Sequence, residues 1–163
     1  MSVQLDHITV YKNTNGDSRV AKIEPTIEAF QEANKDHIVD VNALMKQVCI
    51  QLEEQARHHD WTKCEEPYQT MFYRDLCSAV TDHTNFVEGE WYKAHITEER
   101  HHLNSRVPDD VNLFDVLEML VDCCVAGKAR NAENVYAPSL SDDVLQKAFQ
   151  NTFDILCDAV DVR

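Results

Sequence analysis

Basic residues, glycine and proline are all scarce in this chain of 163 residues. The 15 lysines and arginines stand against 29 aspartates and glutamates, which gives a formal net charge of -14. Binding to a nucleic-acid backbone needs clustered lysine and arginine, so this balance argues against a nucleic-acid surface. It does not exclude a small phosphorylated substrate, because a bound divalent cation reverses the local field. With 3 glycines and 4 prolines, the composition suits a mostly helical fold with short connections.

The chain also lacks long apolar runs and paired cysteines. There is no basic-then-apolar leader, and no apolar stretch is long enough to span a bilayer. The 6 cysteines include no C-x-x-C pair, so we expect reduced, mainly buried thiols rather than a disulfide framework. These absences predict a soluble cytoplasmic protein without membrane contact.

The first 23 residues differ in pattern from the rest. The stretches "VQLDHITVY" and "SRVAKI" are rich in β-branched residues and flank "KNTNGD", in which Asn15-Gly16 is a strong turn signal. We expect a β-hairpin or an extended arm over residues 1–23. Residues 24–163 are expected to form a single helical domain, because they contain no repeat, low-complexity segment or linker.

Helical patterns follow from Glu24 onward. Pro25 suits the first position of a helix, and Asp36 is a candidate N-cap for the next one. Another helix starts near Pro67, and the last has Ser141 as its expected N-cap. The expected helical stretches after Pro25 cover residues 37–52, 66–80, 91–104, 111–130 and 139–160, the fourth of them opened by Pro108 and Asp109-Asp110.

Histidine and aspartate recur in a suggestive order along these helices. The order is His37, His59-Asp60, His95, His101-His102 and Asp122. Imidazole and carboxylate are suitable ligands for Zn, Mn, Fe, Ni or Co, and carboxylate also suits Mg. The chain therefore contains the ligand types of a divalent metal site.

Helical spacing indicates which of these side chains share a face. On an unbroken helix His95, Glu99 and His102 lie on one face, whereas His101 points well away. The later carboxylates Glu118 and Asp122 share a face with Asp115, beside an apolar stripe, which is where a buried metal site could be built.

Two geometric conditions apply to the earlier histidines. Adjacent residues point about 100° apart on a helix, so His59 and Asp60 reach one ion only if the helix end faces the site. The alternative for this pair is a solvated helix end. One straight helix would put His37 and His59 about 33 Å apart. His37 is therefore a ligand only if the chain folds back between Gln47 and Gln55.

This order resembles the HD-domain superfamily of metal-dependent phosphohydrolases, which has an early helical histidine, a His-Asp pair, later histidines and a final aspartate. The matching residues are His37, His59, Asp60, His95, His102 and Asp122. In "HHDWTK" a lysine soon follows the pair, which implies a phosphate contact for Lys63. More narrowly, "HHDWTK", "ERHH" and "PDDVNLFDVLEMLVDCCVAGKAR" are similar to a family of small phage-encoded proteins of unassigned function, which would place the chain in a host cytoplasm.

The resemblance implies an all-α, HD-like helical bundle with one or two divalent ions (Mn, Fe, Ni, Co, Zn or Mg). A metal-activated water would then hydrolyse a nucleotide or another small phosphate ester. Glu99 or Glu118 would act as a base or orient a ligand histidine, and Lys63 and Arg100 would contact the phosphate. Two alternatives stay open: an HD-type di-iron oxygenase with the same ligands, and a non-enzymatic phage protein that binds a host factor. A homo-oligomer is compatible with each of them.

Overall fold

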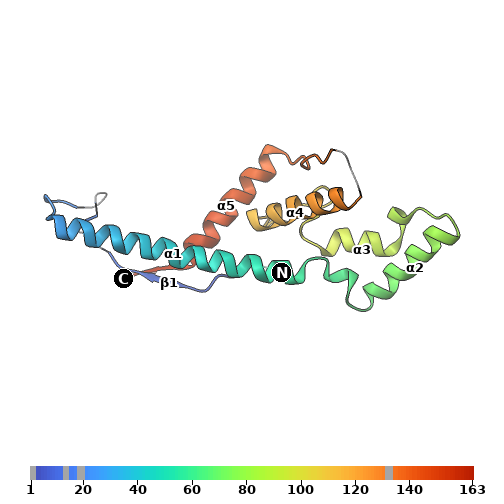
Figure 1. The fold of residues 1–163 in the computed structure, drawn as a ribbon, viewed down its shortest axis with the longest axis horizontal. Coiled ribbons are helices and arrows are strands. Elements are labelled where there is room, and N and C mark those ends of the chain that lie inside the picture. Colours follow the sequence, from blue (N-terminus) through green and yellow to red (C-terminus); the bar gives the residue numbers. More distant parts are fainter. Residues whose placement is uncertain (1–2, 13–14, 18–20, 131–133) are drawn as a thin grey trace. The chain divides into compact units, whose positions relative to one another are not determined.

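The computed structural model describes residues 3–12, 15–17, 21–130 and 134–163. Over these residues the fold is mostly helical, as predicted, with five α-helices and one pair of short strands (Figure 1). The elements in chain order are β1 (Ile8–Val10), α1 (Ile27–His58), α2 (Tyr68–Thr81), α3 (Glu90–Glu98), α4 (Leu113–Ala129), α5 (Asp142–Asp158) and β2 (Val160–Val162). None of the helices in the described part of the chain is both long and apolar enough to cross a membrane.

The described chain divides into two compact units. One unit is formed by Glu54–Thr152, and the other by the segments Ser2–Glu53 and Phe153–Arg163. The domain boundary predicted near residue 24 stays a prediction.

The two strands come from opposite ends of the chain and pair in parallel. Ile8 is in register with Val160, and Val10 with Val162. The predicted hairpin is therefore wrong, because β1 pairs with the C-terminal strand β2 and not with a neighbouring strand. Residues 18–20 of the expected return strand lie outside the described residues, and its described part, Ala21–Ile23, forms no strand.

The predicted turn at Asn15-Gly16 is present, and it packs against α1. A Cβ atom built on Gly16 would lie 1.9 Å from the carbonyl oxygen of Ala29. Only glycine permits so close an approach between two backbones.

Helix α1 is a single helix of 32 residues. The helix start expected after Asp36 is absent, and so is the fold-back between Gln47 and Gln55 that His37 would need to be a ligand. No glycine or proline occurs within Ile27–His58, so nothing in the sequence interrupts the backbone hydrogen bonds.

Within the Glu54–Thr152 unit, α2 and α3 lie side by side and are joined through a short 3-10 turn, Phe86–Glu88 (Figure 1). Helix α2 begins after Pro67, as predicted. The carboxylate of Asp75 in α2 accepts a hydrogen bond of 2.8 Å from the backbone N–H of Trp91 in α3. The ring of Phe72 stacks on Trp91 at a centroid distance of 4.1 Å. These contacts bury Trp91 at the base of the histidine-bearing helix.

Helix α3 is shorter than the predicted helix over residues 91–104. It ends at Glu98, and Glu99 is already in extended conformation. The following segment contributes Leu103 and Val111 to a core shared with Val116 of α4 and Ala148 of α5. Burial of these side chains in the connection explains why the helix does not continue.

Helices α4 and α5 begin at side-chain caps. The side chain of Asn112 accepts hydrogen bonds from the N–H groups of Phe114 and Asp115, and the Asp115 carboxylate accepts one from the N–H of Asn112. This capping box sets the start of α4, later than the Pro108 opening that was expected. Ser141 Oγ accepts from the N–H of Val144 at 3.4 Å, which confirms the predicted cap of α5.

The six cysteines are free, as predicted, but the expectation that they are mainly buried is wrong. Cys49, Cys64, Cys124 and Cys157 are exposed.

Candidate metal centre

The site begins where α1 ends. The helix stops at His58, and Asp60 has a left-handed backbone conformation with φ 57° and ψ 33°. Non-glycine residues rarely adopt this conformation, and it reverses the chain direction. His59 and Asp60 therefore lie just beyond a helix end, which meets the condition for both side chains to reach one site. The exposed His58 ring instead contacts the carbonyl oxygen of Glu54 at 2.9 Å.

The carboxylate of Asp60 is the centre of the site. Its Oδ2 atom lies 3.3 Å from His59 Nε2, and its Oδ1 atom lies 3.5 Å from His95 Nε2 and 3.7 Å from His101 Nε2. His102 Nε2 lies 2.8 Å from His95 Nε2. Four imidazole Nε2 atoms thus converge around one carboxylate.

The ligand-type atoms form three overlapping groups, in each of which the atoms lie within 4.8 Å of one another. The groups are His59 with His101 and Glu118, Asp60 with His95 and His102, and His59 with Asp60 and Asp122. Asp60 belongs to two groups, and its two oxygens face different histidines. The arrangement can therefore hold either one ion or two ions that share a carboxylate.

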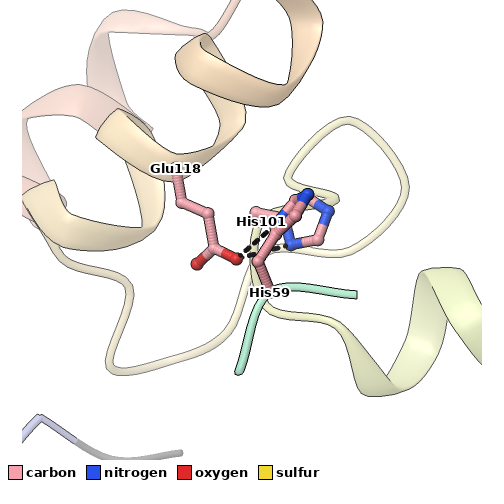
Figure 2. A group of neighbouring side chains, drawn as sticks. All are labelled: His59, His101 and Glu118. Carbon is pink, nitrogen blue, oxygen red and sulfur yellow. Dashed lines mark hydrogen bonds and ion pairs between the residues drawn. The ribbon is translucent and has the colours of Figure 1, made fainter. Parts of the chain in front are cut away.

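Glu118 of α4 faces the outer side of two of these rings (Figure 2). Its Oε1 atom lies 2.9 Å from His59 Nδ1 and 3.1 Å from His101 Nδ1, the latter within ion-pair distance but outside hydrogen-bond geometry. Gln55 Nε2 donates to the other oxygen at 2.7 Å. Burial opposes ionisation of Glu118, but His101, His59 and Gln55 outweigh it and lower its pKa to about 2. Glu118 is therefore ionised, accepts a hydrogen bond from His59 and lies within ion-pair distance of His101.

The protonation of the histidines differs with their surroundings. Burial, together with the charge of His102, lowers the pKa of His95 to about 3, and burial also lowers the pKa of His102. The hydrogen bond to Glu118 instead raises the pKa of His59. Two of the four rings are thus held in the neutral form, which is the form that binds a metal.

Two buried atoms at the centre have no hydrogen-bond partner. They are Asp60 Oδ1 and His101 Nε2, and they lie 3.7 Å apart. An unpaired buried polar group costs about 1–3 kcal/mol. A divalent cation between the two would satisfy both, and imidazole nitrogen with carboxylate oxygen is the donor set that Mn, Fe, Co, Ni and Zn accept. The residues present therefore fit a transition-metal site.

This chain belongs to a family of unknown function, DUF5662. The family profile matches residues 26–155, which include every residue of the candidate site. No curated protein and no solved structure matches the chain. The HD fold and the narrower likeness to phage-encoded proteins therefore stay predictions.

The lysine of "HHDWTK" lies beside the carboxylate in this DUF5662 chain. The Lys63 ammonium group forms an ion pair with Asp60 Oδ2. Burial raises the pKa of Asp60, but the contacts with Lys63 and His59 outweigh it, so that the pKa is lowered. Lys63 thus places a cation at the site, and its side chain is partly exposed.

Three predicted site residues have other surroundings. Arg100 donates to both carboxylate oxygens of Asp115 at 2.8 Å and to Asp110 at 3.0 Å, so the expected phosphate contact finds no support. Glu99 is buried against Thr62 and belongs to none of the three groups. His37 is exposed on an unbroken α1, so the condition for its participation is not met.

Two residues of this DUF5662 site were not selected from the sequence. His101 was expected to point away, because the helix was extended past Glu98; the adjacent "HH" was the signal that could have identified it. Thr62 is fully buried and contacts His95 Nδ1 at 2.6 Å. A threonine carries no signal of this kind in the sequence, because its role depends on tertiary contacts.

Proposed function

We propose that this DUF5662 protein is a metal-dependent phosphohydrolase that acts on a nucleotide or another small phosphate ester. The observation that supports the proposal is the convergence of four imidazole Nε2 atoms on Asp60, with Asp122 3.7 Å from His59. This convergence leaves Asp60 Oδ1 and His101 Nε2 unpaired in the protein interior unless a cation binds.

Each side chain has a distinct task in this proposal. His59, Asp60 and Asp122 would hold one ion. A second ion would be held by Asp60 together with His95, His101 and His102. A bound divalent ion lowers the pKa of water and neutralises charge on a phosphoryl group. Glu118 keeps the His59 and His101 rings turned inward, and the ammonium group of Lys63 contacts the substrate phosphate.

The high negative charge of the chain makes the cation essential for such a substrate. With a net charge of -14, the protein as a whole repels phosphate esters. Bound divalent ions together with Lys63 reverse this field locally. Hydrolysis should therefore depend steeply on the concentration of the divalent ion.

The proposal is tested by metal content and phosphate release. We expect the protein purified without a histidine tag to carry about one or two transition-metal ions per chain, as in dinuclear hydrolases. Asp60→Ala should lose the ions and phosphate release from nucleotides, whereas Asp82→Ala, an exposed aspartate at the end of α2, should retain both. Wild-type protein that stays metal-free after incubation with Mn, Fe, Co and Zn would overturn the proposal.

An HD-type di-iron oxygenase is the second candidate. It is favoured by the two ligand groups that share Asp60, because such a pair of groups suits two iron ions, and by the engagement of Arg100 with Asp115 rather than with the cluster. Iron as the metal found, with consumption of dioxygen and no release of phosphate, would select this candidate. A metal-loaded protein with neither activity would favour the non-enzymatic alternative.

A further inference from the structure

The ring of His95 is held by contacts at its Nδ1 atom and on its face. Its Nδ1 atom lies 2.6 Å from the hydroxyl oxygen of Thr62, and its face stacks on Trp91 at a centroid distance of 4.5 Å and an interplanar angle of 16°. The indole N–H of Trp91 in turn donates to the carbonyl oxygen of Thr62 at 3.0 Å. The side chains of His95, Thr62 and Trp91 are all buried. The imidazole therefore has one orientation, with Nε2 toward Asp60.

The partners of Thr62 determine where the proton of His95 lies. Both the backbone N–H and the hydroxyl of Thr62 donate to Oε1 of Glu99, at 3.0 Å and 2.8 Å. A hydroxyl has a single proton, and a carboxylate only accepts. Because that proton points to Glu99, the hydroxyl oxygen must accept from His95, so that the ring proton lies on Nδ1. His95 Nε2 then presents a lone pair to the centre of the site.

We propose that Thr62 and Glu99 are positioning residues that fix His95 in its metal-binding tautomer. Glu99 then acts through the Thr62 hydroxyl and not on the substrate. Of the two roles expected for Glu99 from the sequence, this is the orientation of a ligand histidine and not that of a base. The inference rests on the metal binding of the proposed function but not on its hydrolytic step.

Metal affinity separates this role from simple packing. Thr62→Val keeps the side-chain shape but removes the hydroxyl, and we expect it to weaken Co(II) binding about 10- to 100-fold, the usual effect of losing the partner of a ligand histidine. Thr62→Ser keeps the hydroxyl and should bind within about threefold of wild type, well short of that loss. The matched control is Thr152→Val. Thr152 is another buried threonine, whose hydroxyl donates to Ala148 and accepts from Leu113, and its loss should leave Co(II) affinity unchanged.

The tautomer itself can be read in the metal-free protein by nitrogen-15 NMR of the histidine rings. We expect His95 of wild type to carry its proton on Nδ1. In Glu99→Leu the Thr62 hydroxyl loses its acceptor and becomes free to donate to Nδ1, so the proton of His95 should move to Nε2. This reversal is not expected from a residue that serves only packing.

Either measurement can overturn the proposal. The positioning role of Thr62 and Glu99 is contradicted if wild-type His95 carries its proton on Nε2, or if Thr62→Val binds Co(II) with wild-type affinity. Either result counts even if phosphate esters are hydrolysed. The converse result is a Co(II) affinity that falls as expected in Thr62→Val while the wild-type protein hydrolyses no phosphate ester. That result supports the positioning role of Thr62 and overturns the proposed phosphohydrolase function. The NMR measurement uses wild-type protein, so it decides the question if a variant fails to fold.

Discussion

At the scale of single residues, the unusual feature of the site is that one carboxylate oxygen serves two histidines. Oε1 of Glu118 lies within 3.1 Å of the Nδ1 atoms of both His59 and His101. Carboxylates on the outer side of ligand histidines fix the ring orientation and increase ligand basicity. Glu118 therefore links two candidate ligands to α4 through a single side chain.

This arrangement makes Glu118 sensitive to a conservative change. Glu118→Gln replaces the carboxylate by a neutral amide, so no negative charge faces the His59 and His101 rings. We therefore expect Co(II) affinity to fall about tenfold or more. Competition with a chelator measures the dissociation constant. The same substitution at exposed Glu98 in α3 should change nothing. Equal affinities for wild type and Glu118→Gln would show that the carboxylate is not needed to orient the rings.

The sequence predicted which residues form the site better than it predicted what each of them does. His59, Asp60, His95, His102, Asp122 and Glu118 were selected because metal ligands come from a short list of side chains. The structure brings these six together, and their role as ligands stays a prediction. Thr62 and His101 were missed because their contacts depend on how the chain turns after α1 and α3, and no local pattern encodes those turns.

At the scale of the elements, the start of α4 is fixed by one buried ion pair. Asp115 is 1% exposed and accepts two hydrogen bonds from Arg100 and one from the N–H of Asn112. It therefore joins the capping box of α4 to the segment that carries His101 and His102. Removing one partner of a buried ion pair such as Asp115–Arg100 lowers the free energy of unfolding, because the other charge stays buried without compensation.

Loss of Asp115 should therefore destabilise the fold. Asp115→Ala leaves Arg100, which is 19% exposed, with only Asp110, and we expect the free energy of unfolding to fall by about 2–4 kcal/mol. Denaturant titration measures the change. Asp109→Ala removes a fully exposed partner of Lys147 and should cost less than about 1 kcal/mol. Comparable losses in the two variants would contradict a structural role for the Asp115 pair.

The helices could be predicted where caps and periodicity agree, as at Pro67 and Ser141. The fold-back in α1 was a condition for His37 to be a ligand, and the local sequence contains no glycine or proline that would interrupt the helix there. The end of α3 at Glu98 could not be predicted, because Glu99 turns inward to reach Thr62, a tertiary contact. The partner of β1 is a strand of three residues at the other end of the chain, which no local signal identifies.

At the scale of the whole molecule, the terminal strands and the candidate metal centre belong to different units. All the candidate ligands lie within Glu54–Thr152, whereas β1 and β2 lie in the other unit. Deletion of residues 160–163 removes β2 and the carbonyl of Arg163 that accepts from Lys12. Hydrogen exchange at Lys12 should accelerate, while Co(II) affinity stays within about threefold, because no ligand or ligand partner is lost. A large loss of affinity would show that the site depends on the terminal sheet.

Acid should destabilise the metal-free protein through the buried His95 and the half-buried Glu118. The pKa of His95 is lowered from 6.5 to about 3, so between these values the unfolded chain binds a proton that the folded one does not. Stability contributed by neutral His95 is therefore complete above pH 6.5 and is lost as the pH falls toward 3. Glu118, with its pKa lowered from 4.5 to about 2, adds a further loss between those values. His59 acts in the opposite sense, because its raised pKa stabilises the fold below pH 6.5 and loses that contribution as the pH rises.

The contribution of His95 can be isolated by comparing slopes. One proton bound only by the unfolded chain changes the free energy of unfolding by at most about 1.4 kcal/mol per pH unit. Guanidinium unfolding of metal-free wild type between pH 7 and 5 should therefore show a steeper loss of stability than His95→Gln, whatever the absolute stability of the variant. The matched control is His37→Gln, which changes an exposed histidine of α1 and should keep the wild-type slope. If wild type and His95→Gln lose stability in parallel, His95 is protonated as readily in the folded chain as in the unfolded one. The ring would then not be held neutral, and the site would need to release a proton before a metal could bind.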